Sequence, residues 1–172
     1  MSEPKTHAPP VDSPLIAKVT ARFGEAIWKS HAEHGDQTII VDPRRIVEVI
    51  SYLKAEPSLD FNVLMDLCGV DYLPRRPRFE VVYHLYSLTH NHRLRVKVQL
   101  DGPEPEVDSI TSLYLGANWF EREAWDMFGI RFNGHPDPRR ILMYEEFVGH
   151  PLRRDYPFDK RQPIVETRTK HV

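Results

Sequence analysis

The periodicity of the sequence ends at Gly129. Residues 131–172 show no sustained period, and they contain Pro136, Pro138, Pro151, Pro157 and Pro163. A stretch of this length without regular structure is uncommon in a compact domain and is usually functional or disordered. This stretch carries more aromatic and aliphatic side chains than disordered segments do. We therefore predict an extended arm, residues 131–172, that docks mostly on a partner.

Hydrophobic spacing in residues 14–130 predicts an αβ core domain. Helices are expected over 14–23 and from Asp42 to just before Pro57, each started by a capping side chain and a proline. Strands are expected over 38–41, 63–72, 79–88 and 93–100. The second and third of these strands should pair, and the third and fourth should be joined by a hairpin turn. The stretch between Gly24 and Thr38 is expected to be a polar loop.

A further helical region is expected from Asp108 onwards. Its first part rests on the helical spacing of Ile110, Leu113 and Tyr114. Gly116 interrupts the pattern, and a new helix is expected to start at Asn118, with Glu121 as the capping-box partner of that residue. Gly129 is a conventional stop signal for this helix.

Composition suits one hydrophobic core. With 172 residues, 41% of them hydrophobic, the chain is large enough for one domain. The expected fold class is α+β, a single two-layer domain with a mixed sheet and flanking helices, followed by an extended irregular C-terminal arm. Residues 1–13, rich in proline and poor in apolar side chains, are expected to be a flexible leader. The net charge of -2 lacks the basic excess that phosphate binding needs, so no nucleic acid is expected as a partner.

Two sets of ionisable side chains could in principle do chemistry. Glu123 and Asp126 share one helical face, but Arg122 can pair with Asp126, so an ion pair is preferred to acid–base catalysis or metal binding. His135 and His150 stand in repeated Gly-His-Pro tripeptides and could ligate zinc or iron in a stand-alone metalloenzyme. Turn histidines are the preferred interpretation, because the spacing fits no metal motif. The same preference applies to His84, His90 and His92.

Three motifs in the last third of the chain carry a family resemblance. They are Glu-Arg-Glu-x-x-Asp-Met-Phe at 121–128, Gly-His-Pro-Asp-x-Arg-Arg-Ile-Leu at 134–142, and Gly-His-Pro-Leu-Arg-Arg-Asp-Tyr-Pro at 149–157. In order and separation they resemble the signature of the C-type subunit of NADH-quinone oxidoreductase, respiratory complex I. The resemblance extends from about Leu15 to Phe158.

The resemblance implies a cofactor-free subunit of the peripheral arm of the complex. FMN and iron–sulfur clusters would lie in partner subunits, and quinone would be bound by neighbouring subunits. The chain would contact chiefly the quinone-site subunit (D-type) and the adjacent iron–sulfur subunit (B-type). It would lie on the cytoplasmic side of the cell inner membrane, held there only through the complex. The complex would pass electrons from NADH to quinone, coupled to proton translocation, with no catalytic residues in this chain.

The resemblance also implies a set of contact residues at matching positions. Those expected at subunit interfaces are Glu121, Arg122, Glu123, Asp126, His135, Arg139, Arg140, His150, Arg153, Arg154 and Asp155. One departure is Pro138, where the family usually has an apolar residue, commonly leucine. Related hydrogenase complexes and the plastoquinone-reducing complex use similar subunits, so these remain alternatives for the electron donor.

Overall fold

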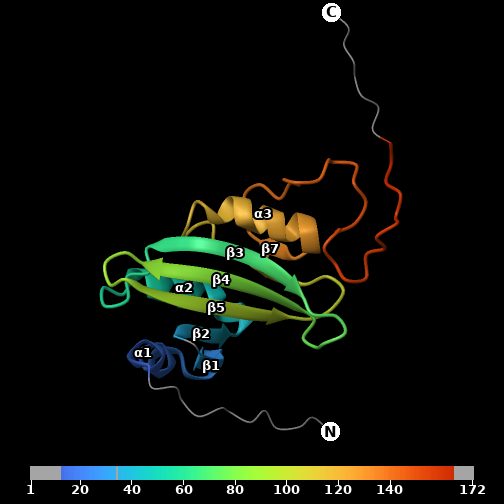
Figure 1. Ribbon diagram of the computed structural model, residues 1–172. Helices are drawn as coiled ribbons and strands as arrows, with labels where there is room; N and C mark the ends of the chain where they lie inside the picture. The colour runs from blue at the N-terminus through green and yellow to red at the C-terminus, as the bar shows by residue number, and fades with distance from the viewer. Residues whose placement is uncertain (1–12, 34, 165–172) are drawn as a thin grey trace, which may run out of the picture.

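A mixed sheet forms the centre of the computed structural model, which describes residues 13–33 and 35–164 (Figure 1). Its strand order is β1-β2-β5-β4-β3. The strands are β1 (Ile27–Glu33), β2 (Asp36–Val41), β3 (Val63–Asp71), β4 (Phe79–Ser87) and β5 (His92–Leu100). Only the β2–β5 pair is parallel among these strands. The predicted α+β class with a mixed sheet is confirmed.

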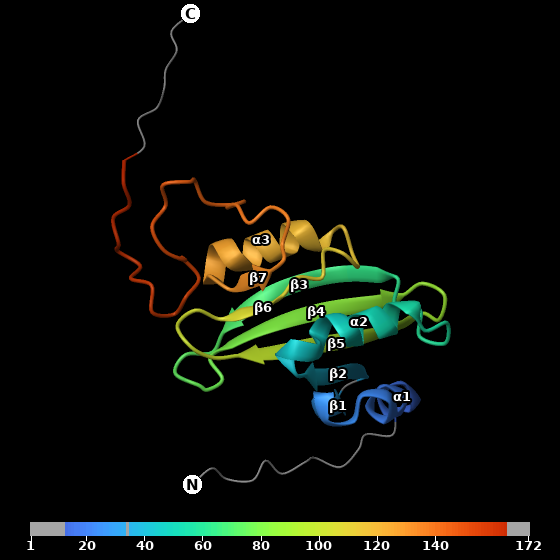
Figure 2. The same ribbon diagram turned by 180° about the vertical axis from the view of Figure 1, so that it is seen from behind.

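Three helices flank the sheet in the described part of the chain. Helix α1 (Pro14–Phe23) lies beside β1, and α2 (Ile46–Ala55) covers one face of the sheet, as the view from behind shows (Figure 2). Helix α3 (Ala117–Phe128) runs along β3. Apolar side chains of all three helices pack with one face of the sheet into a single core. Burial of this apolar surface is the main stabilising term of the fold.

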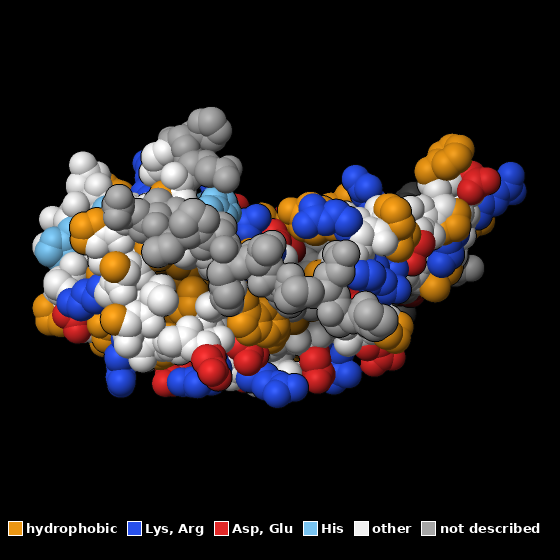
Figure 3. Space-filling view, turned by 90° about the horizontal axis from the view of Figure 1, so that it is seen from below, with side chains coloured by type: hydrophobic (Ala, Val, Ile, Leu, Met, Phe, Trp, Pro, Cys, Tyr) orange, Lys and Arg blue, Asp and Glu red, His pale blue; other side chains and the backbone are white. Residues whose placement is uncertain are grey.

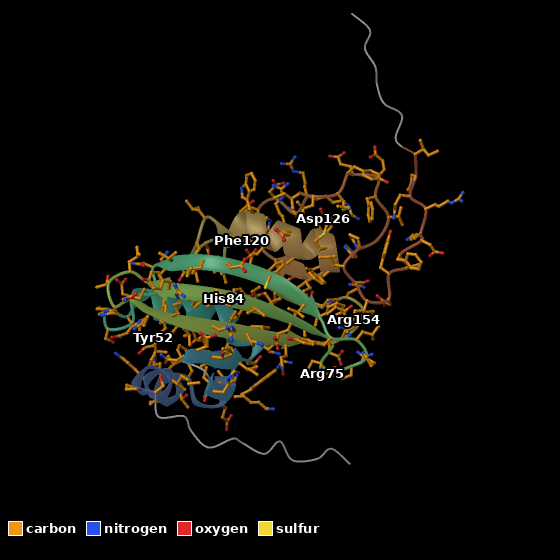
Figure 4. All side chains as sticks on the ribbon, viewed as in Figure 1. Tyr52, Arg75, His84, Phe120, Asp126 and Arg154 are labelled. Atoms are coloured by element: carbon orange, nitrogen blue, oxygen red, sulfur yellow. The ribbon has the colours of Figure 1, made fainter. Side chains whose placement is uncertain are left out.

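Strand β5 shows how the sequence sets the two faces of the sheet. Its alternating Leu94, Val96, Val98 and Leu100 are buried in the core, as predicted. The side chains between them are more exposed and carry charge or amide groups, since successive residues of a strand point to opposite faces. His84 of β4 lies on this second face, toward the viewer in Figure 4. Helix α1 has the bounds that its pattern predicted, and α2 ends before Pro57 as predicted. The predicted start of α2 was wrong, because Asp42 caps a short 3-10 helix (Pro43–Arg45) and the α-helix begins only at Ile46.

The prediction of a polar loop between Gly24 and Thr38 was wrong. Residues 27–33 form β1, the edge strand, which pairs antiparallel with β2. An edge strand has one neighbour and needs few apolar side chains, so its mixed sequence gives little of the alternation by which strands are recognised.

The prediction of a helical region starting at Asp108 was also wrong. Residues 106–108 form β6 (Glu106–Asp108), which pairs in parallel with β7 (Arg131–Asn133). After β6 the chain makes a single turn, in which Leu113 and Tyr114 both donate backbone bonds to the carbonyl of Ile110. Strand β7 also gives regular structure to a segment that was expected to be irregular throughout.

Helix α3 differs from prediction at its start and agrees at its end. It begins at Ala117 after Gly116, without a side-chain cap, so Asn118 is not the N-cap and Glu121 is not its capping-box partner. It ends at Gly129, whose φ of 71° is the left-handed conformation that glycine adopts without strain. Gly69 of β3 lets the helix approach closely, because an added Cβ would lie 2.8 Å from the Phe128 ring.

The remaining boundaries concern the chain ends. Residues 1–12 of the expected leader and residues 165–172 of the expected arm lie outside the described residues. Ser13 is the N-cap of α1, where its hydroxyl accepts a bond of 3.3 Å from the N–H of Ile16. Within 13–33 and 35–164, no helix is long and apolar enough to span a bilayer.

Candidate subunit interface

Asp126 is the centre of the contacts between α3 and the C-terminal arm. Its side chain is fully buried and its Oδ2 accepts bonds from the N–H groups of Ile141, Leu142 and Met143, at 3.1, 2.8 and 2.9 Å. Its Oδ1 accepts a bond from Arg140. Burial opposes ionisation, but these donors outweigh it and lower the pKa of Asp126 below its usual value. The carboxylate therefore holds residues 140–143 of the arm against the helix.

Arg140 closes the arm into a loop. Its Nη2 donates to the carbonyls of Phe147 and Gly149, at 2.8 and 3.1 Å. The guanidinium carbon lies 5.5 Å from the ring centroid of Trp125 and 5.5 Å from that of Phe147. Planar guanidinium groups bind carboxylates and stack on aromatic rings at the same time, which a lysine does less well. The predicted Arg122–Asp126 pair does not form, since Arg140 takes that place.

The C-terminal end of α3 is capped by the arm. His150 donates from Nδ1 to the carbonyl of Asp126 at 3.0 Å, and Arg153 donates from Nε to the carbonyl of Phe128 at 2.6 Å. The last carbonyls of a helix have no partner within the helix, and cationic or N–H donors there are favourable. Arg153 also lies over the ring of Phe79, with 5.1 Å to its centroid.

A second group of ion pairs joins the arm to the turn between β3 and β4. Arg78 makes paired bonds of 2.7 and 2.9 Å to Asp71, and paired bonds of 2.7 and 2.8 Å to Asp155. Burial opposes ionisation of Asp71, but Arg78 and the N–H groups of Leu73 and Arg154 hold its pKa at about 2. Figure 4 shows Arg154 beside this turn, which carries Arg75. Sequence reasoning missed Asp71 and Arg78, because no local pattern links them to Asp155.

Glu121 occupies the opposite end of α3 and faces inward. Its residue is 1% exposed, and its Oε1 accepts a 2.8 Å bond from the N–H of Ile110. Its Oε2 has no hydrogen-bond partner in the described part of the chain, and Nε2 of His135 lies 3.9 Å away. Burial raises the pKa of Glu121 to about 7, against the opposing effect of the bonds from Ser109 and Ile110. Glu121 is therefore buried within the isolated chain, and its predicted contact with a partner stays a prediction.

The other predicted contact residues on this side differ in exposure. Arg122 donates to the carbonyls of Arg139 and Arg140, at 3.0 and 2.8 Å. Arg139 itself is exposed and pairs with Asp137, while Glu123 is exposed on α3. His135 accepts from the N–H of Asp137 and donates to the carbonyl of Asn118, at 3.0 and 3.1 Å. These residues hold the loop after β7 against the first half of α3.

The two histidines of the Gly-His-Pro tripeptides, the candidate metal ligands, are held far apart. His135 binds the carbonyl of Asn118 and His150 that of Asp126, eight residues along α3. Eight residues of α-helix rise about 12 Å, so the two imidazoles cannot share one ion in this arrangement. Among the residues that the structure describes, no cluster of three or more His, Cys, Asp or Glu side chains could hold a metal. His90 and His92 bond to the carbonyls of Pro57 and Leu59, respectively.

The arm exposes several large apolar side chains. Its exposed large hydrophobic residues are Leu142, Tyr144, Val148, Leu152, Phe158 and Ile164. The face near α1 and β1 also mixes hydrophobic with charged side chains over its visible part (Figure 3). Several ionisable side chains of the arm bond to the domain, while large apolar side chains of the arm are exposed among charged ones. Such an arrangement suits a surface that another protein covers.

Comparison with known proteins decides the family. Residues 39–162 match the family model described as the respiratory-chain NADH dehydrogenase, 30 Kd subunit. A stretch of 152 residues is 52% identical to the second C-type subunit of NADH-quinone oxidoreductase of Rhizobium etli (strain CIAT 652), covering 86% of this chain and 81% of that protein. The chain belongs to this family of C-type subunits. The resemblance of the three motifs is confirmed.

Further members of the family and solved structures agree. The C-type subunit of NADH-quinone oxidoreductase of Roseiflexus sp. (strain RS-1) is 51% identical over 143 residues, covering 83% of this chain and 82% of that protein. A trypsin-resistant fragment of Nqo5 is 32% identical, with a TM-score of 0.62, over 72% of this chain and 96% of the fragment. A chain of the archaeal membrane-bound sulfane sulfur reductase shares the fold, with a TM-score of 0.68 over 92% of this chain and 97% of that chain, at 17% identity.

Proposed function

We propose that this chain is a non-catalytic structural and assembly subunit in the peripheral arm of a proton-translocating NADH:quinone oxidoreductase. It contacts chiefly the quinone-site subunit (D-type) and the adjacent iron–sulfur subunit (B-type). FMN and the iron–sulfur clusters are carried by partner subunits, and quinone is bound by its neighbours. The chain lies on the cytoplasmic side of the inner membrane and is held there through the complex.

The observation that carries this proposal is the set of large apolar side chains that the arm exposes. The arm is attached to the domain by ionisable side chains, Arg140, Arg153 and Asp155, which bond to the chain itself. They shape the arm and are not poised for chemistry on a substrate. Its apolar side chains point away from the domain, with Phe158 101% and Ile164 95% exposed. Surfaces of this kind associate with other proteins through their aromatic and aliphatic anchors.

The first test is affinity purification of the tagged chain from gently solubilised membranes. We expect subunits bearing flavin and iron–sulfur clusters to co-purify with NADH-dependent quinone reduction. Co-purification with a hydrogenase-type complex that lacks this activity would contradict the proposal that NADH is the electron donor. Reduction of quinone from NADH by the purified chain alone would contradict the non-catalytic role.

A matched set of variants tests the arm itself. Leu152→Ser and Phe158→Ser should each lower the recovery of partner subunits about tenfold or more, because exposed apolar anchors lose their contacts. Leu88→Ser is the control, since Leu88 is 64% exposed in the turn after β4, at the other end of the sheet. An equal loss in the control would show a general solubility effect and not docking of the arm.

A further inference from the structure

A pocket lies between the first half of α3 and the segment that starts with β7. Its volume is about 310 Å³, the size of a site for a small molecule or a side chain. Glu121 and His135 lie at its floor, where both side chains are at most 3% exposed. Trp125 and Phe132 are among its apolar wall residues. Gly134, another lining residue, is exposed.

Among the described residues, Glu121 brings a polar atom without a partner to the pocket, and a second such atom, on Tyr83, lies near Glu121 but outside the pocket lining. Oε2 of Glu121 and the hydroxyl of Tyr83 are both buried, and neither makes a hydrogen bond within residues 13–33 and 35–164. The two groups are close enough that the charge of Glu121 helps to raise the pKa of Tyr83, although burial is the main cause. Native proteins leave few buried polar atoms unpaired, and such atoms often mark a missing occupant.

The charge around the pocket selects an anionic occupant. Arg122 and Arg131 contribute two guanidinium groups to the lining, where a cationic side chain would be repelled. Because burial raises the pKa of Glu121 to about 7, its carboxyl is protonated below that pH and offers an O–H donor. A carboxylate in the pocket could accept this bond and pair with Arg131, whose side chain is 60% exposed and lies 3.9 Å from the exposed carboxylate of Glu104.

The surface beside the pocket indicates that the carboxylate belongs to a protein. Trp119 is 68% exposed and stands three residues before Arg122, so the two side chains are neighbours on α3. Leu115, just before the helix, is 91% exposed. Tryptophan and arginine side chains around a pocket are typical of the anchor points of protein interfaces.

We propose that this pocket receives an aspartate or glutamate side chain of a partner subunit, with Trp119 as the apolar anchor beside it. The proposal rests on the proposed function, because it names one point of contact within the complex. It adds a second docking surface, on the side of α3 that carries Glu121, to the apolar surface of the arm.

Rebinding of the purified full-length chain tests the surface. The probe is the pair of D-type and B-type partner subunits, produced without this chain and solubilised. Arg131→Glu and Trp119→Ala should each weaken binding tenfold or more. Arg22→Glu on α1 is the control for charge reversal and should change binding less than twofold, because α1 lies beside β1, at the opposite edge of the sheet from α3 (Figure 1). Unchanged thermal melting of the three variants would exclude misfolding.

The outcomes separate the two proposals. If the wild-type chain binds and both pocket variants bind equally well, the pocket proposal is overturned and the proposed function stands. If the wild-type chain captures no subunit of the complex, the proposed function fails with it. A photo-reactive amino acid at Asn133, which lines the pocket, identifies the occupant. A cross-link to a partner segment with Asp or Glu supports the proposal, whereas a link only to this chain's own segments overturns it.

Two further measurements are specific to a carboxylate. Replacing the cross-linked acidic residue of the partner by Arg should restore binding to the Arg131→Glu variant. Binding of the wild-type chain should weaken between pH 6 and pH 8 as Glu121 ionises, and Glu121→Gln should remove this dependence. The groups that face Glu121 are His135, Tyr83 and the Ser109–Ile110 turn, and Arg122 neighbours it on α3. An unchanged pH profile in the Gln variant would contradict the role of Glu121.

Discussion

Each half of helix α3 buries one carboxyl group, and the surroundings shift the pKa values of the two groups in opposite directions. Asp126, in the second half, accepts bonds from three backbone N–H groups and one guanidinium, and its pKa is lowered. Glu121, in the first half, has one oxygen without a partner, and its pKa is raised to about 7. Five residues therefore separate a completed structural contact from an incomplete one.

The two carboxylates differ in whether the chain itself supplies all their hydrogen-bond donors. A buried carboxylate with all its donors in place fixes the chain around it, as the arm is fixed at Asp126. A buried carboxyl group with an unpaired oxygen costs stability, and it persists where something else supplies the partner. Burial alone does not separate the two cases, since both side chains are 0% exposed. The number and identity of the donors do.

The strongest test of the comparison removes the completed contact. Asp126→Ala should destabilise the isolated chain by about 3–5 kcal/mol, because Arg140 loses its partner while still partly buried, and three N–H groups lose their acceptor. Urea unfolding measures the loss. Limited proteolysis should also cut within 140–149 faster than in the wild-type chain. A loss below about 1 kcal/mol would mean that Asp126 is not the anchor of the arm.

The second test compares the stability of wild type and Glu121→Gln as a function of pH. The pKa of Glu121 rises from 4.5 to about 7 on folding, so the folded state binds a proton that the unfolded state has lost. Stability should therefore fall as pH rises from about 4.5 to 7, by about 3 kcal/mol, and stay lower above that pH.

The glutamine variant should lack this fall, because its amide does not titrate. The difference between the two chains isolates Glu121 from the histidines, whose own titration is common to both. Chemical unfolding at intervals between pH 4 and pH 8 measures it. A constant difference across this range would show that Glu121 ionises normally in the folded chain.

The parts of the fold that were predicted correctly depend on local patterns. The alternation in β5 and the spacing of Val49, Ile50 and Leu53 in α2 are each contained in one element and each faces one core. The same method failed after Asp108, where apolar residues at helical spacing are buried by a single turn between β6 and α3. Spacing indicates which residues share a face and not whether the backbone continues as a helix.

The candidate site was predicted less well than the fold. The motif residues were singled out, but Asp126 was predicted to form an ion pair with Arg122, four residues before it. Its ion-pair partner in the structure is Arg140. Asp71 and Arg78 were missed entirely. The bonds of Asp126 to Arg140 and of Arg78 to Asp155 join residues 14 and 77 positions apart, and a single sequence contains no signal that brings them together. The contacts of the arm with partner subunits stay a prediction.

The smallest expected effects separate two arginines that the sequence predicts to act alike. From sequence, Arg139→Ala and Arg153→Ala are both expected to weaken assembly and to leave the melting temperature of the isolated chain nearly unchanged. Arg153 bonds to the carbonyls of Phe128 and Pro103 and stacks on Phe79, so its loss should destabilise the isolated chain by about 1–3 kcal/mol. Arg139 is exposed and pairs only with Asp137 among the described residues, so its loss should cost about 0–0.5 kcal/mol.

Thermal melting of the two isolated variants, followed by recovery of the complex, distinguishes the roles. If Arg153 acts within the chain, its variant melts at a lower temperature before any partner is added, and its loss of assembly follows from the displaced arm. If Arg139 acts only at an interface, its variant melts like the wild type and still assembles less well. Equal melting temperatures of the two variants would mean that the contacts of the arm at the end of α3 contribute little to the stability of the isolated chain. Asp126 alone would then hold the arm against the second half of the helix.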